Sequence, residues 1–168
     1  MNVRQLALAH VASNFVGVNS SNTEIVNRIR RAADGKALGE PWCACFVQWA
    51  VRDVDQFVVD FGMQLRAQML YATESTQALW TQSAHDIRRS APEVGAVAVW
   101  RLDSDHSRGH CGIVVGVDTD TVHTVEGNTS ATGGTSEAER NGNGVWNKKR
   151  TGGKIPGFTL LGYLLPWG

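Results

Sequence analysis

The stretch EPWCACFVQWA, residues 40–50, places two of the three cysteines of the chain two positions apart inside an apolar run. Proline is favoured in the first turn of a helix, so Pro41 predicts a helix that begins close to it. Cys43, Phe46 and Val47 then share one side of this helix. The stretch therefore predicts a buried helix with Cys43 at or near its N-terminus.

Two interpretations of Cys43 follow from that position. The unpaired backbone N–H groups and the dipole at a helix N-terminus favour a thiolate, which lowers the pKa of a cysteine and makes it a usable nucleophile. Cysteine is also a small hydrophobic residue that is often simply buried. The stretch alone leaves both interpretations open.

The residues before this stretch predict helices. Apolar residues at helical spacing over residues 3–12, with Val3 and Leu6 among them, indicate an amphipathic helix. Ser21 and Glu24 form a capping-box pattern that opens a second helix. Residues 33–41 are typical of a loop, and residues 55–90 are typical of helix or loop.

The residues after it predict strands. Short β-branched segments separated by turn residues are typical of an antiparallel sheet, and they occur at residues 93–100, 110–117, 121–128, 141–150 and 157–167. Helices followed by such a sheet predict an α+β fold. Residues 1–168 form one domain in this interpretation, because no linker or internal repeat divides them.

A cysteine nucleophile requires a base, and the base requires a residue that orients it. His110 is the strongest candidate of the five histidines, because it opens the most apolar strand. The others lie in a helix, a strand or polar loops and are more often packing or surface residues: His10, His85, His106 and His123. Glu126 and Asn128 end the next strand and supply a carboxylate and an amide.

The register of this hairpin tests the hypothesis. A three-residue loop at 118–120 would place His110 opposite Asn128 and Gly112 opposite Glu126, with all the polar side chains on one face of the sheet. A loop of two or four residues would place Glu126 and Asn128 on the opposite face of the sheet from His110. A catalytic role therefore requires an odd loop or a β-bulge.

A zinc site is disfavoured by the same geometry. Cys43, Cys45, His110 and Cys111 are possible ligands, but Cys45 lies about 200° around the helix axis from Cys43. Cys111 points to the opposite face of its strand from His110. We therefore expect no metal and no cofactor, and we expect Cys45 and Cys111 to be core residues.

Charge and hydropathy exclude several classes of partner. Lysine and arginine total 16, as do aspartate and glutamate, so the chain lacks the basic excess of a nucleic-acid-binding protein. No apolar run is long enough to cross a membrane. The N-terminal residues lack the pattern of a signal peptide. We expect a soluble monomer synthesised in the host cytoplasm.

The chain resembles the CHAP family, the cysteine- and histidine-dependent amidohydrolases/peptidases that cut bacterial peptidoglycan. Four blocks carry the resemblance in order: GEPWCACFVQW, PEVGAVAVWR, GHCGIVVGV followed by VEGNTS, and GNGVWNKKR followed by IPGF. The resemblance implies a papain-like fold with Cys43 as nucleophile, His110 as base, and Glu126 and Asn128 as the residues that orient it. It differs from members with an Asp-rich calcium loop, because the loop before the cysteine holds only Asp34 and Glu40, and we therefore expect no structural calcium.

The resemblance implies a bacteriolytic amidase or endopeptidase that acts on peptidoglycan through an acyl-enzyme. We expect a phage endolysin without a wall-binding domain, which acts on the cell wall after release from the cytoplasm. The alternatives are an injected antibacterial effector with the same chemistry and a catalytically silent wall-binding module. The bond that is cut is not determined by these residues; its selection is expected to depend on the loops at 101–109 and 129–144.

Overall fold

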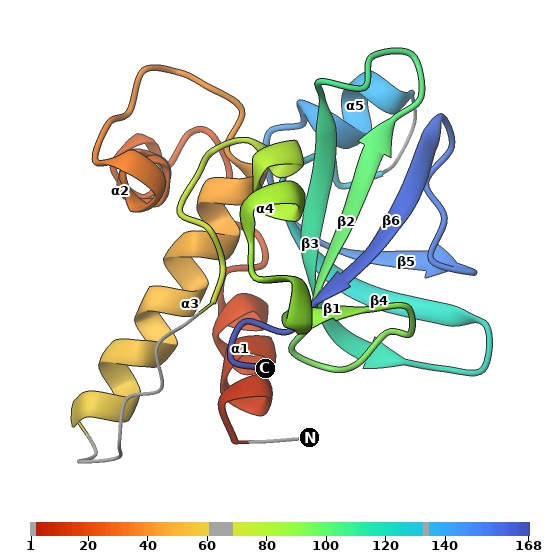
Figure 1. Ribbon diagram of the computed structural model, residues 1–168. Helices are drawn as coiled ribbons and strands as arrows, with labels where there is room; N and C mark the ends of the chain where they lie inside the picture. The colour runs from red at the N-terminus through yellow and green to blue at the C-terminus, as the bar shows by residue number, and fades with distance from the viewer. Residues whose placement is uncertain (1–2, 61–68, 133–134) are drawn as a thin grey trace.

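The computed structural model describes residues 3–60, 69–132 and 135–168. The first half of the chain is helical, and Figure 1 shows these helices gathered on one side of the sheet. Their bounds are α1 Val3–Asn14, α2 Thr23–Asp34, α3 Cys43–Asp60 and α4 Thr76–Gln82, followed by a 3₁₀ turn at His85–Ile87. The expectation for residues 55–90 falls partly on 61–68, which lie outside the described residues.

The second half forms an antiparallel sheet in the order β1-β6-β2-β3-β4-β5. Its strands are β1 Arg88–Arg89, β2 Val97–Leu102, β3 Gly109–Val117, β4 Thr121–Thr129, β5 Gly144–Thr151 and β6 Phe158–Leu164. The short helix α5, Ser136–Arg140, lies between β4 and β5. The predicted α+β fold, with N-terminal helices packed on a C-terminal antiparallel sheet, is confirmed.

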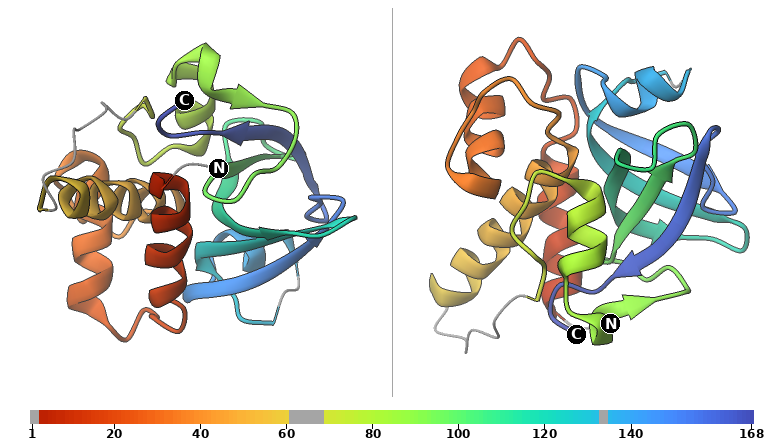
Figure 2. Two further views of the ribbon diagram at one scale, coloured as in Figure 1. Left: turned by 90° about the horizontal axis from the view of Figure 1, so that it is seen from below. Right: turned by 45° about the horizontal axis from the view of Figure 1, so that its top comes forward.

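Both faces of the sheet are apolar. One face, with Val99, Cys111 and Ile113, packs against the helices. The opposite face carries a second cluster that includes Trp100 and Val114, and Figure 2 shows the sheet curving away from the helices on that side. Within the described ranges, no helix is long and apolar enough to cross a membrane.

Two details of the predicted helices are wrong. In α1 the side chains of Val3 and Leu6 are exposed (62% and 49%), and the buried residues include Leu8 and Ala12 instead. The small alanines of α1 allow it to lie close to its neighbours, which favours the face that carries them. In α2 the N-cap is Asn22, without a side-chain cap, and the Ser21 hydroxyl donates to Asn19 rather than to the helix.

The hairpin between β3 and β4 confirms the bulge and not the three-residue loop. Next to the turn, Val117 pairs with Val122, which by itself would give the reversed register. The register then shifts between Val114 and Gly116, so that Ile113 pairs with Val125. The extra residue restores the phase of the strands. Glu126 therefore lies over Gly112, on the same face as His110.

Gly127 sets the distance between this sheet and α3. A Cβ atom at Gly127 would stand 2.7 Å from Cβ of Phe46 and 3.1 Å from the Trp42 ring. The start of α3 packs directly on the β4 backbone, so the position between Glu126 and Asn128 has no room for a side chain. This contact brings the N-terminus of α3 to the strand that carries Glu126.

We expect Gly127→Ala to destabilise the protein by about 1–3 kcal/mol, because the added methyl group overpacks the junction between α3 and β4. Gly116→Ala is a matched control, since its Cβ would meet only His123 at an ordinary contact distance of 3.5 Å. Chemical denaturation of both variants measures the difference. Equal stability of the two variants would contradict this account of the junction.

Candidate active site

Cys43 is the first residue of α3, as the sequence predicts. The backbone N–H of Phe46 donates to the carbonyl of Trp42, so the helical hydrogen bonds begin just before the cysteine. The first N–H groups of the helix, including that of Cys43, therefore have no partner within the helix. The Cys43 side chain is 3% exposed and lies at the wall of a small surface cleft.

His110 and Glu126 form a buried pair on the face of the sheet that looks away from the helices. Nε2 of His110 donates to Oε2 of Glu126 at 2.8 Å, and both side chains are fully buried. Nδ1 of His110 is buried and has no hydrogen-bond partner among the described residues. The ring also stacks beside Trp100, with centroids 6.2 Å apart. Glu126 therefore fixes the orientation of the imidazole and leaves Nδ1 available.

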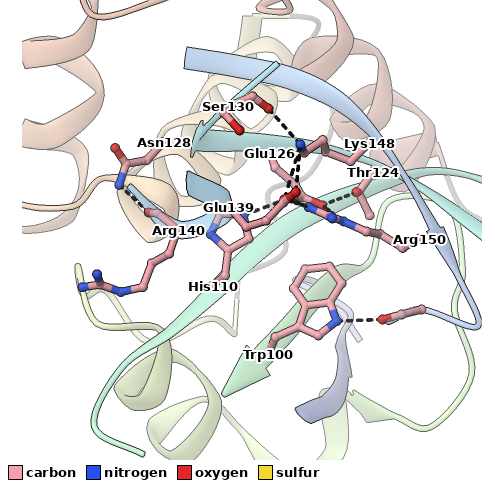
Figure 3. A network of polar contacts seen from close by, with 11 residues as sticks. Trp100, His110, Thr124, Glu126, Asn128, Ser130, Glu139, Arg140, Lys148 and Arg150 are labelled. Carbon is pink, nitrogen blue, oxygen red and sulfur yellow. Dashed lines mark hydrogen bonds and ion pairs between the residues drawn. The ribbon is translucent and has the colours of Figure 1, made fainter. Parts of the chain in front are cut away.

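Arg150 is the second partner of Glu126. Its Nε and Nη2 atoms donate to the two carboxylate oxygens at 2.9 and 2.5 Å, and the Thr124 hydroxyl donates to Oε1 (Figure 3). A planar guanidinium fits a carboxylate in this two-pronged manner. Oε2 of Glu126 is therefore shared between His110 and Arg150.

The buried charges extend beyond Arg150 to α5. Arg150 Nη2 also lies 2.7 Å from Oε2 of Glu139, and Lys148 Nζ lies 3.3 Å from the same oxygen. Lys148 in turn donates to the backbone oxygen of Ser130. Alternate positions of β5 thus supply two cations to two buried carboxylates, since Lys148 and Arg150 point to the same face of the sheet.

Asn128 does not contact His110. Its side-chain amide donates to the backbone oxygen of Arg140 at 2.9 Å, and Figure 3 shows it turned away from the imidazole. Asn128 has φ of 59°, in the left-handed region, where the pairing of β4 with β5 is interrupted. In this structure the residue holds α5 in place, and a role in orienting His110 stays a prediction.

The ionisable groups of the site act on one another strongly. A hydrogen bond with Cys111 lowers the pKa of the Cys43 thiol, whereas burial raises it. His110 and the Ala44 backbone N–H lower it further, so the pKa of Cys43 lies well below its usual range. Burial alone would lower the pKa of His110, but Cys43 and Glu126 raise it to about 9. Burial alone would raise the pKa of Glu126, but His110 and Arg150 hold it at about 2. Both shifts favour a Cys43 thiolate beside a His110 imidazolium.

The pKa values of the other two cysteines shift in the opposite direction, upward. Burial raises the pKa of Cys45 to about 12 and raises that of Cys111 well above its usual value. Both side chains are fully buried in the core between the helices and the sheet. Within the described ranges, no group of three or more His, Cys, Asp or Glu side chains is placed to hold a metal ion.

The cleft beside Cys43 has a volume of about 180 Å³. It is bounded by residues before α3, by the segment that leads into α4, by the loop between β2 and β3 and by the end of α5: Glu40, Pro41, Glu74, Ser75, Thr76, Ser107, Arg108, Gly109 and Arg140. The loops at 101–109 and 129–144 thus both contribute residues. Residues 133–134 of the second loop lie outside the described residues.

The family model of the CHAP domain matches residues 35–128, more than half of the chain. The chain belongs to the CHAP family. The match includes Cys43, His110, Glu126 and Asn128 and ends before β5. A search of curated proteins and a search of solved structures found no match. The family membership agrees with the observed papain-like order of helices and sheet, and it indicates a hydrolase of the amidase or peptidase type that acts on peptidoglycan.

Arg150, Glu139 and Lys148 were not singled out as site residues by the sequence. The run of Lys148, Lys149 and Arg150 is typical of a solvated surface, although Lys148 and Arg150 are buried. The signal available was the alternation of the strand, which places Lys148 and Arg150 on one face. What that face meets depends on the pairing of β5 with β4.

We expect iodoacetamide to alkylate Cys43 selectively at about pH 6, because only this cysteine has a lowered pKa. In His110→Ala the reaction should require a higher pH, since the neighbouring imidazolium is lost. Mass spectrometry of the labelled peptides as a function of pH measures both effects. Labelling with the same pH dependence in the two proteins would contradict the pairing of Cys43 with His110.

We expect Arg150→Lys to keep the buried charge but lose the two-pronged contact with Glu126. Glu126 should then hold His110 less firmly, so the alkaline limb of activity should move below the pH of about 9 set by the pKa of His110. The value of kcat should fall by roughly tenfold, about 1.4 kcal/mol, with little change in KM. Arg28→Lys, an exposed change on α2, is the control. An unshifted pH profile would mean that Arg150 is only structural.

Proposed function

We propose that this protein is a cysteine-dependent peptidoglycan hydrolase in which Cys43 is the nucleophile and His110 is the acid–base residue. The observation that carries the proposal is the state of His110. Glu126 occupies its Nε2 atom, its Nδ1 atom has no hydrogen-bond partner among the described residues, and the ring interacts with the Cys43 thiol. A nucleophile, a base and an orienting carboxylate are the parts that acyl transfer by a cysteine requires.

The reaction begins from the ion pair. The Cys43 thiolate attacks the carbonyl carbon of the scissile amide, and the backbone N–H of Cys43 at the start of α3 stabilises the negative oxygen. Nδ1 of the His110 imidazolium gives its proton to the leaving nitrogen as the C–N bond breaks. A water molecule then attacks the thioester and gives one proton to His110; the C–S bond breaks, and the acid leaves together with the regenerated Cys43 thiolate and His110 imidazolium.

Glu126 and Arg150 support both steps without contacting the substrate. Glu126 stays ionised and so stabilises the imidazolium, while Arg150 compensates the buried carboxylate. The two partners also prevent rotation of the imidazole and of the carboxylate. The same pair of partners therefore provides both the charge and the orientation that His110 needs.

We expect Cys43→Ala and His110→Ala to reduce the clearing of purified cell walls by at least about 10³-fold, because each removes a member of a unit that acts together. Cys45→Ala is the matched control: it removes a buried thiol two residues away that has a raised pKa. Turbidity of a wall suspension measures activity, and circular dichroism verifies folding.

Near-normal clearing by a folded Cys43→Ala variant would overturn the assignment. A wild-type protein that binds walls without clearing them would indicate the catalytically silent module. If only Cys45→Ala lost activity, the nucleophile would be Cys45 and the assignment to Cys43 would be wrong.

We also propose that the enzyme acts as a phage endolysin, synthesised in the host cytoplasm and acting on the wall after release. Its support is the family membership together with the resemblance of the chain to wall-cutting members. A neighbouring gene for a pore-forming protein would support this role. A neighbouring gene for an inhibitory partner would instead support an injected effector.

A further inference from the structure

The cleft beside Cys43 carries opposite charges on different parts of its wall. Glu40 and Glu74 come from the residues before α3 and before α4. Arg108 and Arg140 come from the loop before β3 and from the end of α5. No ion pair joins the glutamates to the arginines within the described residues. The cleft therefore keeps both charges available to a ligand.

The acidic wall has few partners of its own. Glu74 makes no hydrogen bond or ion pair with the described part of the chain, and the pKa of its carboxyl is raised by partial burial and by the charges of Glu40 and Asp34. One oxygen of Glu40 accepts from the Leu38 N–H at 2.6 Å, while Oε1 is buried and has no hydrogen-bond partner in the described part of the chain. The charge of Lys36 lowers the pKa of Glu74, but the ion pair of Lys36 is with Asp34, at 4.0 Å. A cationic group in the cleft would relieve this repulsion.

The basic wall is arranged to receive an anion. The Arg140 side chain is 10% exposed and meets only Glu137, at 3.7 Å, among the described acidic residues. Its guanidinium donates no hydrogen bond within the described ranges, although its backbone is held by Asn128. Arg108 pairs with Asp105 at 3.1 Å, but both side chains are about half exposed. Exposed pairs of this kind are weak and exchange readily for a ligand.

The size of the cleft limits what it holds. Its volume of about 180 Å³ is below the range of roughly 300–1,000 Å³ that is usual for sites enclosing a whole small ligand. A short part of a polymer, one or two residues long, fits this space beside the nucleophile. That part must carry a positive and a negative group close together if it is to satisfy both walls.

We propose that the enzyme cuts a peptide bond within the peptidoglycan stem, next to a diamino acid that carries a free amine and a free carboxylate. The inference rests on the proposed hydrolase function and names its substrate. Glu40 and Glu74 receive the ammonium group, and Arg108 and Arg140 receive the carboxylate. The bond between the sugar and the peptide is disfavoured, because the neutral lactyl and acetamido groups on its sugar side offer no cation to the two glutamates.

The first test is digestion of purified peptidoglycan whose stem contains a diamino acid, followed by mass spectrometry of the fragments. We expect new amino and carboxyl termini within the stem peptide, next to the diamino acid. Fragments produced only by cleavage between the sugar and the peptide would overturn the inference while leaving the hydrolase function intact. The absence of any fragment would instead overturn the proposed function.

The second test pairs enzyme variants with modified substrates. Acetylation of the free amine of a stem peptide should reduce wild-type kcat/KM by roughly three- to tenfold, which is the size expected for one partly screened charge pair. Glu74→Gln should reduce kcat/KM by a similar factor for the peptide with the free amine. For the acetylated peptide, the same substitution should cause no further reduction. Arg108→Gln should behave in the same way toward a peptide whose carboxylate is converted to an amide.

Glu24→Gln provides the control, because it removes a glutamate that is exposed on α2 and absent from the cleft. This variant should keep the wild-type dependence on both groups. If Glu74→Gln also keeps the full wild-type dependence on the amine, the acidic wall does not bind it and the inference is wrong. Thermal unfolding of each variant separates this result from loss of folding.

Discussion

The site depends on one constraint, which is that the carboxylate of Glu126 is buried as a charge. An ion removed from water is stable only with close partners and hydrogen bonds. Glu126 has His110 on one side, Arg150 on the other and the Thr124 hydroxyl at its edge. These partners come from three neighbouring strands, so the compensation of one charge sets the relative positions of β3, β4 and β5. The orientation of the imidazole follows from the same arrangement.

The constraint continues into the wall of the cleft through α5. Glu139 of this helix shares Arg150 with Glu126, whereas the next residue, Arg140, lines the cleft beside Cys43. Asn128 holds the backbone of Arg140 from the end of β4. A short helix of five residues is marginal by itself. Its contacts with the buried charges anchor α5 to the sheet. The part of the cleft wall that α5 supplies is therefore held in a fixed position.

The helical side of the molecule contributes differently. α3 brings Cys43 to the site through apolar packing, in which Phe46 lies directly on Gly127 of β4. The two residues flanking this glycine have separate tasks, since Glu126 points to His110 and Asn128 turns to α5. The left-handed backbone of Asn128 makes this division possible, because it breaks the alternation of the strand. A simple period of two cannot anticipate such a turn, which is why Asn128 was expected to face His110.

The sequence by itself predicted the helix that carries Cys43, the five longer strands of the sheet, and Cys43 and His110 as the candidate nucleophile and base. The spacing around Pro41 predicts α3 with Cys43 at or near its start, and alternating segments predict β2 to β6. The need to bring Glu126 to His110 predicts either an odd-numbered loop or a β-bulge. These are local patterns that depend on backbone geometry. Only the tertiary structure decided that Arg150 neutralises Glu126, that Cys111 contacts Cys43 and that glutamates and arginines which do not pair with one another line one cleft. The reason is physical: whether a charge is solvated or buried depends on which distant strand or loop covers it, and local spacing carries no record of that.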